Sequence, residues 1–245
     1  MFDVDRFVAE CRAALTERTP ELAIKALLQG AVAHPAAVEA ALGTPSEGRI
    51  TPLHHSPELT IIQVVWTPGL VAWPHDHRMW AVIGLYGGRE DNTFYRRAPE
   101  GLAAVGDRRL EGGDVAVLGQ DVIHSVENPL RQFTGAIHIY GGDFFGTPRS
   151  DWETGQERPY NMERARQAFA EANERWRAEC ARSGETTSAS PRWCVGWPRV
   201  PMDKHYAAAQ LKFEEALAAD ERLAEAHNNL AFSLRVQGAK HFERP

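Results

Sequence analysis

Three histidines in this chain have the types and spacing of a metal site. His75 and His77 are separated by one residue, and His124 follows in a later segment. On a β-strand, alternate side chains share a face, so His75 and His77 point the same way while Asp76 points the opposite way. Three neutral imidazoles can bind a divalent ion without cancelling its charge, and they leave coordination positions open. We therefore predict a metal site made of His75, His77 and His124.

Glycines and an asparagine frame these histidines. Gly69 precedes the first pair, and Gly113 and Asn128 flank the third histidine. This arrangement resembles the two signature motifs of the cupin superfamily. Most metal-binding cupins carry a glutamate ligand shortly after the histidine pair, where this chain has Ala81 and Val82. The resemblance implies a mainly β fold, a cupin jelly-roll barrel (double-stranded β-helix) with N-terminal and C-terminal helices, and an all-histidine metal site.

Within that superfamily, residues 48 to 146 resemble the thiol dioxygenases, the family of cysteine dioxygenase and 3-mercaptopropionate dioxygenase. The matching motifs are Trp66-Thr67-Pro68-Gly69, Pro74-His75-Asp76-His77, Trp80-Ala81-Val82-Ile83-Gly84 and His138-Ile139-Tyr140. The resemblance implies a mononuclear non-haem Fe(II) enzyme that oxidises a small thiol-carboxylate to its sulfinate. Its expected partners are therefore a small thiol substrate and O2.

The resemblance also assigns roles to residues near the metal. The family's Ser-x-His-x-Tyr strand corresponds to Ala136, His138 and Tyr140. We expect the Tyr140 hydroxyl to donate a hydrogen bond to the reacting oxygen. Ala136 lacks the serine hydroxyl, so the relay that orients Tyr140 would be incomplete or completed by water. Val82 stands where animal cysteine dioxygenases carry a cross-linking cysteine, so that cross-link cannot form. Arg49 matches, by spacing, the arginine that binds the substrate carboxylate.

Other polar residues of the same region receive no role. Glu90, Asp91 and Asn92 follow a Gly-Gly turn. Acidic residues beside turns are usually solvated, so we do not expect coordination from them. His54 and His55 stand in a predicted loop, and we leave them unassigned.

The pattern along the chain divides it into five parts. Residues 1–45 show helical periodicity, with Thr19-Pro20-Glu21 as a helix start, and form a predicted N-terminal helical layer. Residues 46–148 form the barrel, because short apolar runs alternate with glycine turns. Residues 149–182 contain an amphipathic helix, at 160–181, that packs on the barrel. Residues 183–204 are a predicted linker, and residues 205–245 a helical hairpin.

The hairpin resembles one tetratricopeptide unit, most clearly over residues 205–238. A single unit cannot bury its own apolar face and normally stacks on neighbours. The segment could therefore dock on the barrel, associate with a second copy of the chain, or bind a helix of a protein partner. The simpler alternative is a hairpin that only covers apolar surface.

Composition agrees with a soluble enzyme, and we expect the protein to be cytoplasmic. The 245 residues are 43% hydrophobic and 24% charged, with a formal net charge of -6, which disfavours nucleic acid as a partner. The apolar runs are too short to span a membrane, and the N-terminus lacks the basic start of a secretory signal. Cys11, Cys180 and Cys194 are widely spaced, so we expect free thiols, as in a reducing compartment.

Several alternatives remain open at this stage. The chain could be a metal-dependent cupin lyase, isomerase or oxygenase acting on a non-thiol molecule, because Ala136 and Val82 depart from the thiol dioxygenase pattern. It could also be a non-catalytic sensor or scaffold. The three histidines could be hydrogen-bonded barrel residues of a cupin without its ion. Arg49 could be a surface residue, and His138 could simply satisfy a buried hydroxyl.

Overall fold

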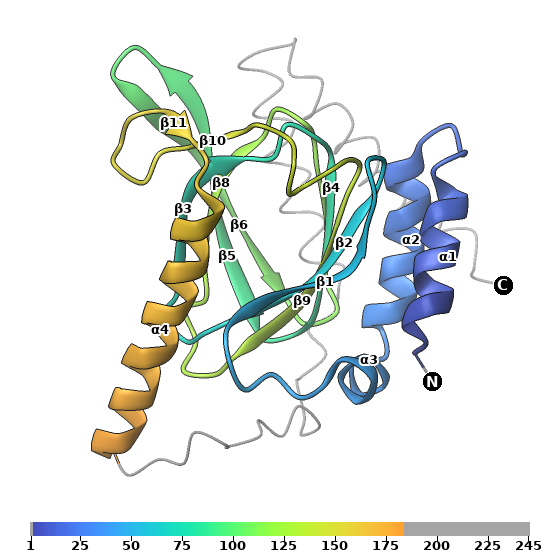
Figure 1. Cartoon of the computed structure of the whole chain (residues 1–245), viewed down its shortest axis with the longest axis horizontal. Helices are drawn as coiled ribbons and strands as arrows, with labels where there is room; N and C mark the ends of the chain where they lie inside the picture. Colours follow the sequence, from blue (N-terminus) through green and yellow to red (C-terminus); the bar gives the residue numbers. More distant parts are fainter. Residues whose placement is uncertain (1, 184–245) are drawn as a thin grey trace, which may run out of the picture. The chain divides into compact units, whose positions relative to one another are not determined.

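The structure is a computed structural model, and it describes residues 2–183. Two antiparallel sheets form a barrel (Figure 1). The first has the order β1 (Arg49–His55), β2 (Thr60–Trp66), β9 (Thr134–Tyr140), β4 (Ala81–Gly87), β7 (Val115–Leu118). The second has the order β11 (Arg158–Pro159), β10 (Ser150–Asp151), β3 (Val71–Asp76), β8 (Ile123–Glu127), β5 (Arg89–Ala98), β6 (Gly101–Glu111). The chain crosses from one sheet to the other at every step from β2 to β5 and again at every step from β6 to β10, which is jelly-roll connectivity. The predicted fold class is confirmed.

Three strands of the first sheet, β2, β4 and β9, are buried along their whole length. One face of these strands lines the barrel interior, where Ile62, Ile83 and Ala136 belong to the inner core. The other face packs against the N-terminal helices, through Ile61 and Ile139. Burial on both faces explains why these strands are continuous apolar runs and not alternating ones.

The N-terminal layer consists of α1 (Val4–Ala14), α2 (Pro20–Val32) and α3 (Pro35–Leu42). Helix α2 begins where predicted, with Thr19 as the N-cap residue and Pro20 in the first turn. It lies so close to β4 that a Cβ atom on Gly84 would come within 2.6 Å of the Leu28 side chain. The close approach of α2 therefore requires glycine at this position.

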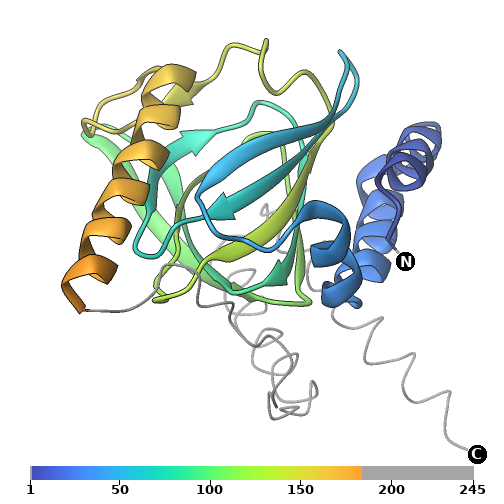
Figure 2. The same ribbon diagram turned by 60° about the horizontal axis from the view of Figure 1, so that its bottom comes forward.

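Helix α4 (Met162–Ser183) covers the side of the barrel away from the N-terminal helices (Figure 2). Asn173 attaches it to the segment before β1. Its Oδ1 accepts hydrogen bonds from the Gly48 N–H at 2.8 Å and from the Thr67 hydroxyl at 2.6 Å, and its Nδ2 donates to the Gly48 carbonyl at 2.9 Å. The helix expected at residues 160–181 is thus present with slightly shifted ends.

The predicted hairpin at residues 205–245, and the predicted linker apart from Ser183, lie outside the described residues. Within residues 2–183, no helix has both the length and the apolar character that crossing a membrane requires. Cys11 and Cys180 are buried free thiols.

Candidate metal centre

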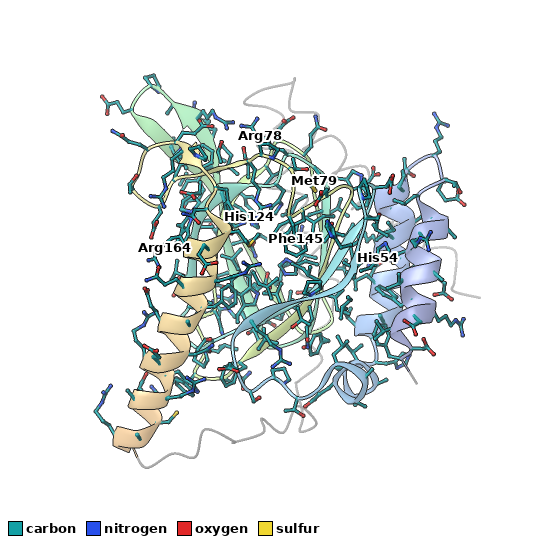
Figure 3. All side chains as sticks on the ribbon, in the orientation of Figure 1. His54, Arg78, Met79, His124, Phe145 and Arg164 are labelled. Atoms are coloured by element: carbon teal, nitrogen blue, oxygen red, sulfur yellow. The ribbon has the colours of Figure 1, made fainter. Side chains whose placement is uncertain are left out.

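The three predicted histidines meet inside the barrel. His75 lies on β3, His77 follows the end of that strand, and His124 lies opposite His75 on β8. The Nε2 atom of His77 is 3.2 Å from Nε2 of His75 and 3.4 Å from Nε2 of His124. Figure 3 shows His124 within the barrel, between the two sheets. The tertiary structure therefore brings together residues from two segments, as the metal-site prediction requires.

The protonation of the rings favours a cation between them. His75 Nδ1 lies 2.9 Å from the Trp73 carbonyl, and His124 Nδ1 lies 2.9 Å from Asn92 Oδ1. In both rings Nδ1 therefore carries the proton, and the Nε2 lone pairs face the other imidazoles. His77 Nδ1 has no hydrogen-bond partner. Lone pairs at these distances repel one another unless a proton or a metal ion lies between them.

The spacing of the nitrogens fits a metal ion. A divalent ion bound by imidazole at about 2.0–2.1 Å, with ligand angles of about 90–110°, separates neighbouring nitrogens by about 2.8–3.4 Å. Two of the three separations between ligand nitrogens, 3.2 and 3.4 Å, fall in that range. Among the described residues, these three histidines are the group identified as able to hold a metal ion, with all ligand atoms within 4.8 Å of one another.

Burial keeps the three imidazoles in the neutral form that binds metals. It lowers the pKa of His75 to about 4. It lowers the pKa values of His77 and His124 well below the ordinary value of histidine, and the neighbouring imidazoles lower them further. Protons therefore compete weakly for the Nε2 atoms at neutral pH.

Asp76 fixes the end of the metal-binding strand from its other face. Its carboxylate is almost fully buried, and it accepts hydrogen bonds from the Ser150 N–H and pairs with Arg78 Nε, both at 2.7 Å. Ser150 begins β10, whose Asp151 pairs with His75 in the sheet. The segment after β9 is thereby held across the metal-binding strand.

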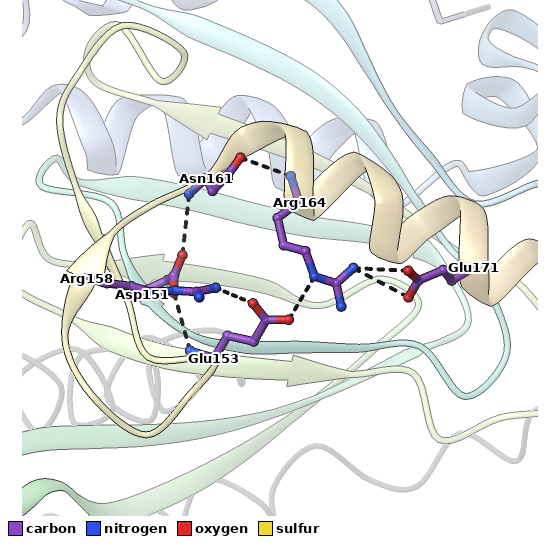
Figure 4. A network of polar contacts seen from close by, with 6 residues as sticks. All are labelled: Asp151, Glu153, Arg158, Asn161, Arg164 and Glu171. Carbon is purple, nitrogen blue, oxygen red and sulfur yellow. Dashed lines mark hydrogen bonds and ion pairs between the residues drawn. The ribbon is translucent and has the colours of Figure 1, made fainter.

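A polar network connects that segment to α4 (Figure 4). Arg158 Nε donates to buried Asp151 at 2.7 Å, and Arg158 also pairs with Glu153. Arg164, on α4, donates from Nε to Glu153 at 2.9 Å and pairs with Glu171 at 3.3 Å. Several ion pairs that share partners can hold a loop in place better than isolated surface pairs do.

A cavity of about 50 Å³ lies beside the three histidines. Its walls come from the inner faces of both sheets and from α4, and most of them are apolar. The lining residues are Ile50, Ile62, Val64, Trp66, Leu70, Val71, Ala72, Trp73, His75, His77, His124, Val126, His138, Tyr140, Phe144, Tyr160, Ala165, Ala168 and Phe169. A small ligand in this cavity would therefore contact the metal-binding imidazoles in a largely apolar environment.

His138 and Tyr140 both line this cavity, as their shared strand face predicts. His138 Nδ1 lies 3.1 Å from the Tyr140 hydroxyl. The Tyr140 ring packs edge-on against His77 at a centroid distance of 5.0 Å and stacks on Phe144 at 4.2 Å. Burial raises the pKa of Tyr140 far above its ordinary value, so its hydroxyl is protonated at neutral pH.

Glu90 and Asn92 correct the expectation that the residues after the Gly-Gly turn are solvated. Both are buried, because positions 90 and 92 of β5 face inward while Asp91 faces outward. Gly88, with φ +80°, makes the turn that sets this register. Asn92 holds the His124 ring, and Glu90 approaches His138. Residues 89–93 are all polar, so the sequence contains no apolar alternation that could mark positions 90 and 92 as buried.

Arg49 does not line the cavity. Its neighbour Ile50 does, and alternation along β1 turns Arg49 to the other face of the sheet. There it lies near Tyr86, whose pKa is raised mainly by burial and lowered in smaller part by the Gln63 hydrogen bond and the Arg49 charge. His54 and His55 also lie outside the cavity lining.

A different arginine, Arg149, lies beside the metal centre, and it has no counterpart among the sequence predictions. Only 7% of its surface is exposed. Its guanidinium carbon is 3.9 Å from the Phe144 ring centroid and 4.0 Å from the Tyr160 centroid, and both rings line the cavity. Nη1 donates to the Phe144 carbonyl, whereas Nε and Nη2 have no hydrogen-bond partner. Because the loop after β9 has no periodicity, sequence alone could not place this residue.

No protein-family model matches the chain. Solved structures similar to it include an RmlC-like cupin protein from Methanocaldococcus jannaschii, at 10% identity, a TM-score of 0.35, and coverage of 40% of this chain and 84% of that one. Oxalate oxidase in complex with the substrate analogue glycolate is similar at 15% identity and a TM-score of 0.33, with coverage of 41% of this chain and 53% of that one. KdgF from Halomonas sp. is similar at 23% identity and a TM-score of 0.32, with coverage of 38% of this chain and 78% of that one. These likenesses cover less than half of this chain, so the chemistry of its site is inferred from its own residues.

Proposed function

We propose that this protein is a mononuclear non-haem iron thiol dioxygenase that oxidises a small thiol-carboxylate, of the cysteine or 3-mercaptopropionate type, to its sulfinate with O2. One observation carries the proposal. The converging Nε2 atoms of His75, His77 and His124 stand at the wall of a cavity that Tyr140 also lines. Arg149, whose Nε and Nη2 have no hydrogen-bond partner, packs against two rings of the same cavity wall. This combination suits a ligand with both a metal-binding atom and an anionic group.

A metal held by three neutral histidines keeps open positions, and Fe(II) bound there would supply sites for a thiolate sulfur and for dioxygen. Imidazole also suits zinc, nickel and copper, so Fe(II) in this proposal rests on the sequence resemblance. The apolar cavity walls, among them Ile62, Val64 and Val126, would exclude water from the reacting groups.

Arg149 takes the role that sequence spacing suggested for Arg49. A guanidinium forms two parallel hydrogen bonds to a carboxylate, and Nε and Nη2 of Arg149 are the two adjacent donors without partners. The rings of Phe144 and Tyr160 fix the plane of the guanidinium. A buried N–H without an acceptor costs free energy, and a bound carboxylate would remove that cost.

Two other functions remain as outcomes of the test. A metal-dependent cupin enzyme acting on a non-thiol carboxylate would use the same histidines and Arg149, with the metal as a Lewis acid. A non-catalytic sensor would bind a ligand there without turnover.

A reducing cytoplasm, where ferrous iron and free thiols persist, would suit the proposed oxygenase. Residues 205–238 are proposed to bind a protein partner or a second copy.

The test is metal analysis of the full-length protein purified without oxygen, followed by oxygen uptake after loading with Fe(II). Cysteine, 3-mercaptopropionate and cysteamine are compared, because cysteamine lacks the carboxylate. Uptake matched by sulfinate formation, with a thiol-carboxylate preferred over cysteamine, supports the proposal. Metal-dependent turnover without oxygen would support the non-thiol enzyme. If none of the compounds is turned over, with or without oxygen uptake, the result would support the sensor.

A further inference from the structure

A chain of buried polar groups connects Tyr140 to a carboxylate on the opposite side of the barrel. The Trp66 indole N–H donates to Glu90 Oε1 at 2.6 Å, and the same oxygen lies 3.4 Å from His138 Nε2. His138 Nδ1 lies 3.1 Å from the Tyr140 hydroxyl. Glu90 is completely buried, and its Oε2 has no hydrogen-bond partner. None of these residues belongs to the metal-binding histidines.

The direction of each hydrogen bond follows from the donor at its end. An indole nitrogen can only donate, so Glu90 Oε1 is an acceptor. The oxygen of an ionised carboxylate only accepts, so His138 Nε2 carries the proton of the hydrogen bond to Glu90. In a neutral imidazole the other nitrogen, Nδ1, has a lone pair and accepts, so the Tyr140 hydroxyl donates to it.

We infer that Glu90 is a positioning residue, which sets the tautomer of His138 and thereby turns the Tyr140 hydroxyl proton toward His138. The inference rests on the proposed function where it concerns turnover. The Tyr140 oxygen then presents its lone pairs to the cavity and accepts a hydrogen bond from a donor group of the substrate. This orientation differs from the sequence expectation that Tyr140 donates into the cavity.

Glu90 also explains how the chain functions without the serine that precedes the histidine in the thiol dioxygenase motif. Ala136 occupies that position on β9 and is fully buried in the inner core. Glu90 comes from β5, a strand of the other sheet, and its Oε1 reaches the nitrogen of His138 that Tyr140 does not use. Trp66, on β2, holds the carboxylate through its indole N–H. The relay is therefore completed by a side chain that is distant in sequence.

The tautomer of His138 can be measured without any activity. Imidazole nitrogen chemical shifts of the full-length protein report which nitrogen carries the proton, and a His138→Phe variant assigns the signals. We expect the Nε2–H tautomer in the unsubstituted protein and in Glu90→Gln, whose amide oxygen can still accept. We expect loss or mixing of that tautomer in Glu90→Leu. An Nδ1–H tautomer in the unsubstituted protein would overturn the inference, even if Glu90→Leu does not fold.

Turnover supplies the second test. Glu90→Leu should lower kcat about tenfold to a hundredfold with little change in KM, as is typical when a group that orients a reacting side chain is lost. Glu90→Gln should restore most of it, and Asp91→Asn, on the outward face of the same strand, is the matched control. In a Tyr140→Phe background, Glu90→Leu should have no further effect. Additive losses would mean that Glu90 does not act through Tyr140.

The two tests also separate this inference from the proposed function. If iron-loaded protein oxidises no thiol, the proposed function fails, and the nitrogen shifts of His138 still decide the role of Glu90. If thiols are oxidised and Glu90→Leu neither changes the tautomer nor lowers kcat, the proposed function stands and Glu90 is only a core residue.

Discussion

Replacing Arg149 by leucine should selectively weaken the reaction of substrates that carry a carboxylate. Leucine fills much of the space between Phe144 and Tyr160 but offers no donor to an anionic group. Nε and Nη2 are buried and have no hydrogen-bond partner, so a carboxylate that reaches them would gain two donors. Hydrogen bonds to charged groups contribute about 1.5–3 kcal/mol each. If neighbouring groups and water compensate in part, the net loss is about 3 kcal/mol, or roughly a hundredfold in kcat/KM.

The assay is steady-state oxygen uptake by iron-loaded protein with 3-mercaptopropionate and with cysteamine. The loss should appear with 3-mercaptopropionate and be much smaller with cysteamine, which has no carboxylate to lose. Arg149→Lys should fall in between, because lysine keeps the charge and loses the planar pair of donors. Metal content and urea unfolding of each variant show whether the site and the fold persist.

Arg49→Leu is the matched control, because Arg49 faces away from the cavity. We expect it to leave kcat/KM for both substrates within about twofold, as is usual for a substitution outside a site, where effects stay within about 0.5 kcal/mol. A larger effect of Arg49→Leu than of Arg149→Leu would refute the assignment of the carboxylate to Arg149. Equal losses with 3-mercaptopropionate and cysteamine would show that Arg149 acts on something other than a carboxylate.

Three further predictions concern the metal centre and the fold. Asn92→Ala should weaken metal affinity about tenfold to a hundredfold, because the His124 ring loses the acceptor that orients it; competition with a metal chelator measures this, and unchanged affinity would contradict the role. The free energy of unfolding of the metal-free protein should fall as pH decreases from about 6.5 toward 4, because burial lowers the pKa of His75 to about 4 and the unfolded chain binds more protons in that interval. His75 alone would account for about 3 kcal/mol of that fall, and a pH-independent urea midpoint would argue against neutral buried imidazoles. Gly84→Ala should destabilise the protein by about 1–3 kcal/mol, through overpacking against Leu28, without changing metal content; an unaltered urea midpoint would show that α2 can shift.

The sequence alone determined the features that depend on local periodicity. Alternation along a strand places His75 and His77 on one face, and the same rule places His138 and Tyr140 together. Glycine turns and short apolar runs indicated the barrel, and Thr19 with Pro20 marked the start of α2. These features need no knowledge of which strand lies beside which.

Only the tertiary structure decided the groups that surround the metal-binding histidines. Asn92 reaches His124 because β5 pairs with β8, and Glu90 reaches His138 because β5 faces β9 across the barrel interior. No local pattern in the sequence encodes which strands lie together. Arg149 packs against Phe144 and Tyr160 of the cavity wall because it lies in an irregular loop that Asp76 and the polar network hold in place. Arg49 faces away from the cavity because a one-residue step on a strand reverses the face. Spacing along the chain can match a motif, whereas the pairing of strands and the packing of the two sheets decide which side chains come into contact.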